Sequence, residues 1–281
     1  MKILVTGGSG YLGTHVCRFF EADDFSRRSG HDILDPSDVQ VAAEYDAIIH
    51  LAGYLDKDPD AADLSFRTNV EGTANIIKQL RPGAVFIYAS TKDVYGAHAS
   101  SYTDAVPETC PTDYCGQTAL EWSKFVGERF VEYYARQRSL RACIFRMSTV
   151  YARPSDGNES GFVTHYVESV KRGWPIRLPL RGQPVRDILH VDDFSRACQA
   201  FTESSQSYGL YNLGGGTENS ATLTEIVGTV SRLIELEPII VNDDALPHPV
   251  PVNYVSDLSR IREELGWRPQ IGIEEGLRSL L

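Results

Sequence analysis

The chain of 281 residues lacks any uninterrupted apolar run of 18 residues, the length that a membrane-spanning helix needs. A transmembrane segment is therefore not expected. The pattern of a folded domain begins at the first residues of the sequence, so we expect no signal peptide and predict a cytoplasmic protein. Internal repeats and low-complexity tracts are also absent, which argues against repeat architectures.

Cysteine is scarce as well. The five cysteines are odd in number and lack the paired spacing of a zinc site, so they are expected to be free thiols. The seven histidines show no metal-binding spacing either, and no metal is expected. His50 and His190 lie in apolar runs and are expected to be hydrogen-bonded core residues.

Positive charge is in deficit. Lys and Arg number 27 against 38 Asp and Glu, which gives a formal charge of −11. This balance argues against a general nucleic-acid binder and against docking on acidic membranes. We therefore expect neither nucleic acid nor a membrane as a partner, and an anionic ligand would need a local basic pocket.

The strongest positive signal is an apolar strand that runs directly into a glycine-rich turn. Gly7, Gly10 and Gly13 stand at GxxGxxG spacing. In such a turn the first glycine permits the tight bend, the second lets the backbone approach phosphate oxygens, and the third lets the next helix pack on the strand. The free N–H groups of a helix that begins near Tyr11 would face the anion. This segment therefore predicts dinucleotide binding.

Apolar strand-like runs alternate with helical patterns along the first half of the chain. Strands are predicted at residues 3–5, 47–51, 85–89 and 142–147, and helices at residues 65–80 and 118–137. This order predicts right-handed βαβ units and an α/β fold with a Rossmann-like, doubly wound parallel sheet. After Tyr151 the strands become shorter and proline and glycine more frequent. We therefore predict a dinucleotide-binding domain at residues 1–150 and a smaller, mainly substrate-binding lobe at residues 151–281, with some return to the sheet.

The short segment after the first helix allows two placements of the second strand. In one, the helix covers residues 14–21 and the strand residues 22–26, with Asp32 and Ile33 in a later turn. In the other, the helix extends to Arg28 and the strand lies at residues 31–35. The sequence leaves both placements open.

Seven short motifs run along nearly the whole chain. They are Thr6-Gly-Gly-Ser-Gly-Tyr-Leu-Gly13, His50-Leu-Ala-Gly53, Asn69-Val-Glu-Gly-Thr-Ala-Asn75, Ala89-Ser-Thr-Lys-Asp-Val-Tyr-Gly96, Arg186-Asp-Ile-Leu-His-Val-Asp-Asp193, Tyr211-Asn-Leu-Gly-Gly-Gly216 and Leu265-Gly-Trp-Arg-Pro269. With these motifs in this order, the chain resembles the extended short-chain dehydrogenases/reductases, the NAD-dependent epimerase/dehydratase family that modifies nucleotide sugars. The resemblance implies NAD or NADP as the cofactor and a nucleoside-diphosphate sugar as the substrate.

The resemblance also implies a set of cofactor-binding residues. They are Gly7, Gly10, Tyr11, Leu12, Gly13, Arg28, Asp32, Ile33, Leu51, Ala52, Gly53, Asn69, Ala89, Ser90 and Lys124. Asp32 and Ile33 resemble the family's adenine contact, and Lys124 the lysine that holds the nicotinamide ribose. Asn69 is expected to bridge backbone groups, a structural more than a catalytic role.

One departure from the family concerns its general acid/base, a tyrosine four residues before the lysine and therefore one helical turn away on the same face. Here Leu120 stands at that position before Lys124. Leucine neither donates nor accepts a proton, so the Tyr-xxx-Lys pair is broken. Tyr114 or Tyr102, from the preceding loop, is a hypothetical replacement; aligning Tyr114 with the family tyrosine would place Thr118 at the lysine position.

The implied substrate side starts at Thr91, which occupies the family's Ser/Thr position for a sugar hydroxyl or carbonyl. Lys92 and Asp93 follow it and are either a base and an acid or a solvated ion pair. Arg186 resembles the arginine that clamps the diphosphate of a nucleotide sugar, for which a planar guanidinium is suited. Thr149 stands where asparagine is usual and would still hydrogen-bond a substrate.

The residues near the second strand bear on which dinucleotide binds. Arg27 and Arg28 would pair with a 2′-phosphate and favour NADP, whereas Asp23 and Asp24 just before them would favour NAD through its ribose hydroxyls. We lean slightly towards NADP.

Two functions follow from these residues. The first is an NAD(P)-dependent epimerase, dehydratase or ketoreductase that works by hydride transfer, with Thr91, Lys124 and a displaced acid/base (Tyr114, Tyr102 or Lys92) as its catalytic residues. The second is a binding protein of the same fold without turnover, which Leu120 supports. A homodimer through helices near residues 74–80 and 118–134 is expected from the resemblance.

Overall fold

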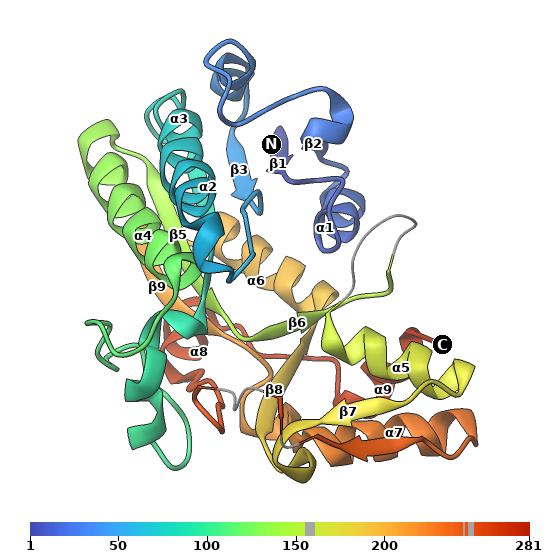
Figure 1. The fold of residues 1–281 in the computed structure, drawn as a ribbon. Helices are drawn as coiled ribbons and strands as arrows, with labels where there is room; N and C mark the ends of the chain where they lie inside the picture. The colour runs from blue at the N-terminus through green and yellow to red at the C-terminus, as the bar shows by residue number, and fades with distance from the viewer. Residues whose placement is uncertain (155–160, 244, 247–249) are drawn as a thin grey trace.

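Six strands form one parallel sheet at the centre of the protein (Figure 1). The computed structural model describes residues 1–154, 161–243, 245–246 and 250–281. In their order across the sheet, the strands are β2 (Asp23–Phe25), β1 (Ile3–Thr6), β3 (Ala47–His50), β4 (Val85–Thr91), β5 (Arg141–Met147) and β9 (Tyr208–Leu213). All neighbouring pairs are parallel. The predicted doubly wound α/β fold is confirmed.

Helices cover both faces of this sheet, which explains why its central strands are apolar throughout. One face packs on α1 (Gly13–Phe20) and α6 (Val191–Glu203). The other packs on α3 (Thr73–Ile77) and α4 (Ala119–Arg138), and α2 (Ala62–Phe66) continues into α3 through a π-helical segment, Arg67–Gly72. Alternate residues of each strand enter the two hydrophobic cores.

The second strand decides between the two sequence-based placements. β2 is Asp23–Phe25, so the placement at residues 22–26 is confirmed and the one at residues 31–35 is wrong. The strand ends at Phe25 because a 3-10 turn, Arg27–Ser29, begins two residues later. Ser26 caps that turn and Gly30 ends it in the left-handed conformation (φ 87°). In the strand order, β2 is one edge of the sheet.

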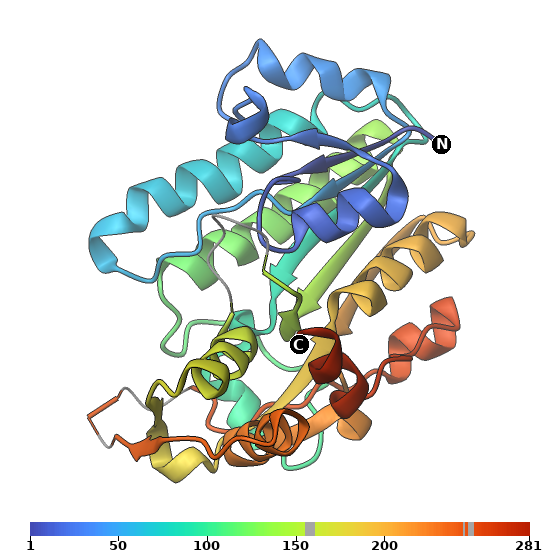
Figure 2. The same cartoon turned by 90° about the vertical axis from the view of Figure 1, so that its right-hand side faces the viewer.

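The remaining elements form a lobe at the carboxyl edge of the sheet (Figure 2). Its strands are β6 (Thr149–Tyr151), β7 (Ile176–Leu178), β8 (Val185–His190), β10 (Ser220–Thr222) and β11 (Ile240–Asn242). Its helices are α5 (Phe162–Arg172), α7 (Leu223–Ile234) and α9 (Ile273–Ser279), which share a third hydrophobic core. α8 (Ser259–Leu265) packs beside β9. The chain beyond residue 150 thus contributes β9 to the six-stranded sheet and α6 to one of its faces. The domain boundary at residue 150 stays a prediction.

Several smaller expectations can be compared with the described residues. The five cysteines are free thiols. His50 is buried and contacts the hydroxyls of Thr6 (2.7 Å) and Thr73 (3.0 Å), as expected of a satisfied core histidine. His190 contacts Ser279 (3.1 Å). Among the residues that the structure describes, no helix is long and apolar enough to cross a lipid bilayer.

A buried ion pair ties α4 to the ends of two central strands. The Arg146 guanidinium donates to both carboxylate oxygens of Glu128, at 3.0 and 2.7 Å. Ser90 donates to the same carboxylate at 2.5 Å. Glu128 is fully buried and Arg146 is nearly so. The bidentate geometry satisfies both charges and fixes Ser90 at the end of β4.

Replacing Arg146 by methionine is expected to destabilise the protein by about 3–5 kcal/mol, because it leaves the Glu128 carboxylate buried without its counter-charge. Urea unfolding of Arg146→Met against the wild type measures this. Arg129→Met is the matched control, since Arg129 contacts Glu128 from an exposed position on the same helix. Equal losses in the two variants would contradict the assignment of the buried pair.

Candidate functional site

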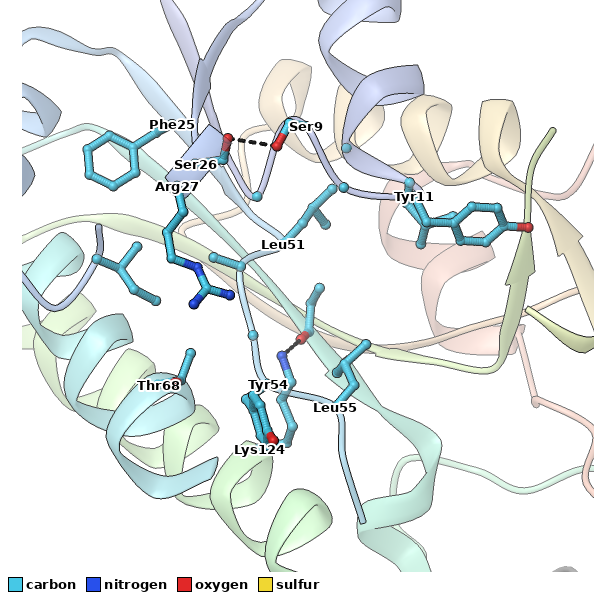
Figure 3. Close-up of a pocket in the computed structure, with 18 of the residues that line it drawn as sticks. Ser9, Tyr11, Phe25, Ser26, Arg27, Leu51, Tyr54, Leu55, Thr68 and Lys124 are labelled. Atoms are coloured by element: carbon cyan, nitrogen blue, oxygen red, sulfur yellow. Dashed lines mark hydrogen bonds between the residues drawn. The ribbon is translucent and has the colours of Figure 1, made fainter. Parts of the chain in front are cut away.

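A cavity of about 640 Å³ lies at the carboxyl ends of β1, β3 and β4 (Figure 3). Doubly wound sheets bind ligands at this edge. Of the residues predicted to bind a dinucleotide, all but one line this cavity: Gly7, Gly10, Tyr11, Leu12, Gly13, Arg28, Asp32, Ile33, Leu51, Ala52, Gly53, Ala89, Ser90 and Lys124. The structure therefore brings together residues that lie up to 117 positions apart, from Gly7 to Lys124.

The glycine turn forms one wall of the cavity. Gly7 adopts a φ of 72°, which only glycine adopts readily, and a Cβ there would lie 2.9 Å from Ala52 N. A Cβ at Gly13 would overlap the carbonyl oxygen of Gly7, so α1 can approach β1 only because this residue has no side chain. The Thr14 N–H makes the bond to Gly10 O (3.2 Å). Tyr11, Leu12 and Gly13, at the start of α1, line the cavity, and the first N–H groups of a helix are donors without intrahelical partners.

Tyr11 joins this wall to the lobe. Its hydroxyl donates to the carbonyl oxygen of Ala152 and accepts from the Ala152 N–H, both at 2.8 Å, and lies 2.8 Å from the Thr164 hydroxyl. All the hydrogen-bonding capacity of this phenol is thus used in holding the cavity wall. Tyr11 is a structural contact between the two parts of the protein.

The end of β2 carries positive charge into the cavity. Arg27 and Arg28 line it, and Figure 3 shows the Arg27 side chain extending into the space below Ser26. Arg28 also donates to the Ser9 carbonyl oxygen at 3.1 Å. The acidic residues of β2 do not line the cavity, and Asp24 accepts a hydrogen bond from Ser26 (2.9 Å). Asp32 is the one carboxylate among the described lining residues, so with Arg27 and Arg28 this end of the cavity keeps a net positive charge.

Asn69 does not line the cavity. It lies behind the wall, where its amide oxygen accepts from the Tyr54 N–H (2.8 Å) and its nitrogen donates to the Tyr54 carbonyl (2.9 Å) and to Ser123 (2.9 Å). The expectation that Asn69 bridges backbone groups is confirmed. It fixes the segment that follows β3 against α4.

At the opposite end from Arg27 the cavity is lined by Thr91, Leu120 and Lys124. Leu120 lies one helical turn before Lys124 on α4, and both side chains face the cavity. Lys124 donates to the carbonyl oxygen of Ala89 at 2.9 Å. Its burial lowers the pKa of its ammonium from 10.5 to about 8. A hydrocarbon side chain thus occupies the position at which the sequence resemblance leads us to expect a phenol.

A comparison with known proteins decides the family. The model of the NAD dependent epimerase/dehydratase family matches residues 3–214. The chain belongs to this family. Among curated members, CDP-paratose 2-epimerase from Salmonella typhi is 26% identical over 100% of this chain and 98% of its own length. A dTDP-glucose 4,6-dehydratase from Mycobacterium tuberculosis is 28% identical over 100% of this chain and 92% of its own length.

Two solved structures illustrate the shared fold. A UDP-glucose 4-epimerase from Thermotoga maritima, solved with UDP-glucose, superposes with a TM-score of 0.84 at 23% identity, covering 100% of this chain and 97% of its own. RMD from Pseudomonas aeruginosa, solved with NADPH, has a TM-score of 0.84 at 20% identity, covering 100% and 98%.

Within this family member, several residues named from the sequence lie outside the cavity lining. Tyr114 is 67% exposed and stacks on Trp122, with ring centroids 6.1 Å apart, so the structure does not bring its phenol to Lys124. Tyr102 ends the 3-10 segment after β4 and packs in a separate small cluster. Thr149 lies in β6, directly after the lining residue Ser148, but does not itself line the cavity.

Lys92 and Asp93 form an ion pair beside the cavity rather than in its wall. The alternative of an ion pair is the one that the structure shows, but the pair is mostly buried rather than solvated: the side chains are 12% and 23% exposed. Burial opposes ionisation of Asp93, yet Lys92 and Lys57 outweigh it and lower the pKa of Asp93 to about 2. Asp93 therefore stays ionised at neutral pH.

Arg186 is buried in the lobe and bonds to backbone. Its guanidinium donates to the carbonyl oxygens of Val185 (2.6 Å), Val252 (2.6 Å) and Pro251 (3.1 Å). These bonds hold the segment around residue 251 against β8. A diphosphate contact by Arg186 stays a prediction.

Sequence reasoning missed part of the cavity wall. Tyr54 and Leu55 line it from the segment after β3, and their position directly after Gly53 was the available signal. Leu64 and Thr68 line it from α2 and the π-helical segment. No local motif marks these two, because only tertiary packing brings that helix to the cavity.

Lys124 generates a pH-dependent prediction. Between its folded pKa of about 8 and its unfolded value of 10.5, the unfolded chain binds more protons, so stability rises with pH across this window. Lys124→Met removes that dependence. We expect its stability relative to wild type to be greatest near pH 7 and to fall by up to about 3 kcal/mol towards pH 10. Urea unfolding at a series of pH values measures the difference, and a pH-independent difference would refute a depressed pKa.

Proposed function

We propose that this protein is an NADP-dependent enzyme that modifies the sugar of a nucleoside-diphosphate sugar by epimerisation, dehydration or reduction. The observation that carries the proposal is the cavity itself, which joins a helix-start anion site, a basic end and a buried lysine beside Thr91. The family and the curated relatives, which are named for CDP-, dTDP- and UDP-linked sugars, support the substrate class.

The residues of the cavity fit a dinucleotide. The glycine turn leaves room where a Cβ at Gly7 or Gly13 would collide with neighbouring backbone. The amides at the start of α1 would hold the diphosphate, and Arg27 with Arg28 would hold a 2′-phosphate at the end of β2. Lys124 would hold the nicotinamide ribose at the other end. A bound nicotinamide supplies hydride transfer to or from a sugar carbon.

The substrate sugar would enter beside Thr91. The Thr91 hydroxyl accepts a hydrogen bond from the Asp93 N–H (3.1 Å), which orients it, and it still has its own proton to donate. It would bind the oxygen of the reacting sugar carbon. The Lys124 ammonium, buried nearby, would stabilise negative charge that develops there.

Leu120 favours a second candidate function. With a leucine in the cavity wall at the place of the family's acid/base, the protein would bind a dinucleotide and a sugar nucleotide without turnover. The two functions predict the same ligands and differ only in product.

Incubation of the wild type with NADP or NADPH and a panel of CDP-, dTDP- and UDP-linked sugars tests the proposal. A new sugar nucleotide in the chromatogram, or a change in absorbance at the nicotinamide band, is the expected result. Binding of the sugar nucleotide without product would favour the non-catalytic function. Absence of dinucleotide binding would overturn both.

The preference for NADP rests on the basic end of the cavity. Arg27→Gln is expected to weaken NADPH binding roughly tenfold, because a charge-assisted contact to the 2′-phosphate is lost, and to leave NADH binding nearly unchanged. Calorimetric titration of both dinucleotides into both proteins measures this. An equal loss for the two dinucleotides, or tighter binding of NADH by the wild type, would contradict the preference.

A further inference from the structure

The end of the cavity that holds Lys124 needs a proton-transfer group that α4 does not supply. Among the described residues that line the cavity, the side chains with a phenol, imidazole or carboxyl group are Tyr11, His31, Asp32 and Tyr54. These four groups differ in their position in the cavity and in the contacts that they already make.

Three of these four groups are unsuitable. The Tyr11 hydroxyl is committed to Ala152 and Thr164. His31 stacks on Phe25 of β2, with ring centroids 4.9 Å apart, at the basic end of the cavity.

Asp32 lies at the same end. Its carboxylate accepts from the Leu34 N–H at 2.9 Å, which holds it in the loop after β2. Tyr54 therefore remains.

Tyr54 is fixed beside Lys124 through its backbone. Asn69 holds both its N–H and its carbonyl, and also bonds to Ser123, the residue before Lys124. A Cβ built on Gly53, the residue before Tyr54, would lie 2.9 Å from Lys124 Nζ. Figure 3 shows Tyr54 and Lys124 at the same end of the cavity, away from Phe25.

A second set of contacts holds the rest of the segment. Lys57 forms ion pairs with Glu121 (2.7 Å) and Asp93 (3.3 Å), and so joins the segment after β3 both to the first turn of α4 and to the residues after Thr91. The Tyr54 hydroxyl lies 3.5 Å from Asp56 Oδ2, at the limit of a hydrogen bond, and Asp56 is exposed. The phenol oxygen therefore lies next to an exposed carboxylate.

We propose that Tyr54 is the catalytic acid/base of this protein and replaces, from the segment after β3, the phenol that Leu120 removes from α4. The proposal rests on the proposed function. In the oxidative direction, the Tyr54 phenolate takes the proton of the sugar hydroxyl. The O–H and C–H bonds of the reacting carbon break, its C=O bond forms, and the hydride passes to the oxidised nicotinamide. In the reductive direction, the Tyr54 phenol returns the proton to the carbonyl oxygen.

Tyr54→Phe tests the proposal, with Tyr133→Phe as the matched control because Tyr133 is 58% exposed on α4. Tyr54→Phe is expected to lower turnover of the sugar nucleotide by about 10² to 10³. A second readout does not depend on turnover. Calorimetry should show the sugar nucleotide binding roughly fivefold more weakly to Tyr54→Phe, and the corresponding nucleoside diphosphate, which lacks the sugar, binding unchanged.

The outcomes separate the two proposals. If Tyr54→Phe turns over the sugar nucleotide as fast as Tyr133→Phe and the wild type do, the role of Tyr54 is overturned and the proposed function stands. Equal weakening of the nucleoside diphosphate and the sugar nucleotide would show a misplaced cavity wall and would also overturn the role. A wild type that turns over no sugar nucleotide would refute the proposed function, and the role of Tyr54 with it.

Discussion

The close approach of α4 to β4 is the constraint on which the site depends. A Cβ at Gly127 would collide with the Tyr88 hydroxyl, so a glycine on α4 allows the helix to lie directly on the strand. One turn earlier, Lys124 then reaches the Ala89 carbonyl at 2.9 Å, and one residue later Glu128 reaches Ser90 and Arg146. The helix cannot shift without breaking all of these contacts, because interiors pack densely.

The same packing explains the electrostatics of the cavity. The protein carries a formal charge of −11, yet Arg27, Arg28 and Lys124 line one cavity. Burial lowers the pKa of Lys124 to about 8, and no carboxylate among the described residues pairs with it, whereas Arg146, equally buried, has Glu128 as a counter-charge. A local basic pocket inside an acidic protein suits a ligand with several phosphates.

How much the sequence predicts depends on how local the signal is. The strand and glycine turn at residues 3–13 and the lysine of α4 follow from short patterns, and the structure brings them to one cavity. Leu120 could be recognised as a departure because its spacing to Lys124 is fixed by the helix. The contacts that sequence alone could not give are tertiary. Arg186 bonds to carbonyls 65 and 66 residues away, and Asn69 holds the Tyr54 backbone from 15 residues along the chain.

A crystal structure of the protein soaked with NADPH tests the central claim most directly, because it locates each part of the dinucleotide. The account predicts the diphosphate at the amides that begin α1, the 2′-phosphate beside Arg27, and the nicotinamide between Tyr54, Leu120 and Lys124. Density for the dinucleotide elsewhere, or the nicotinamide at the Arg27 end, would contradict it.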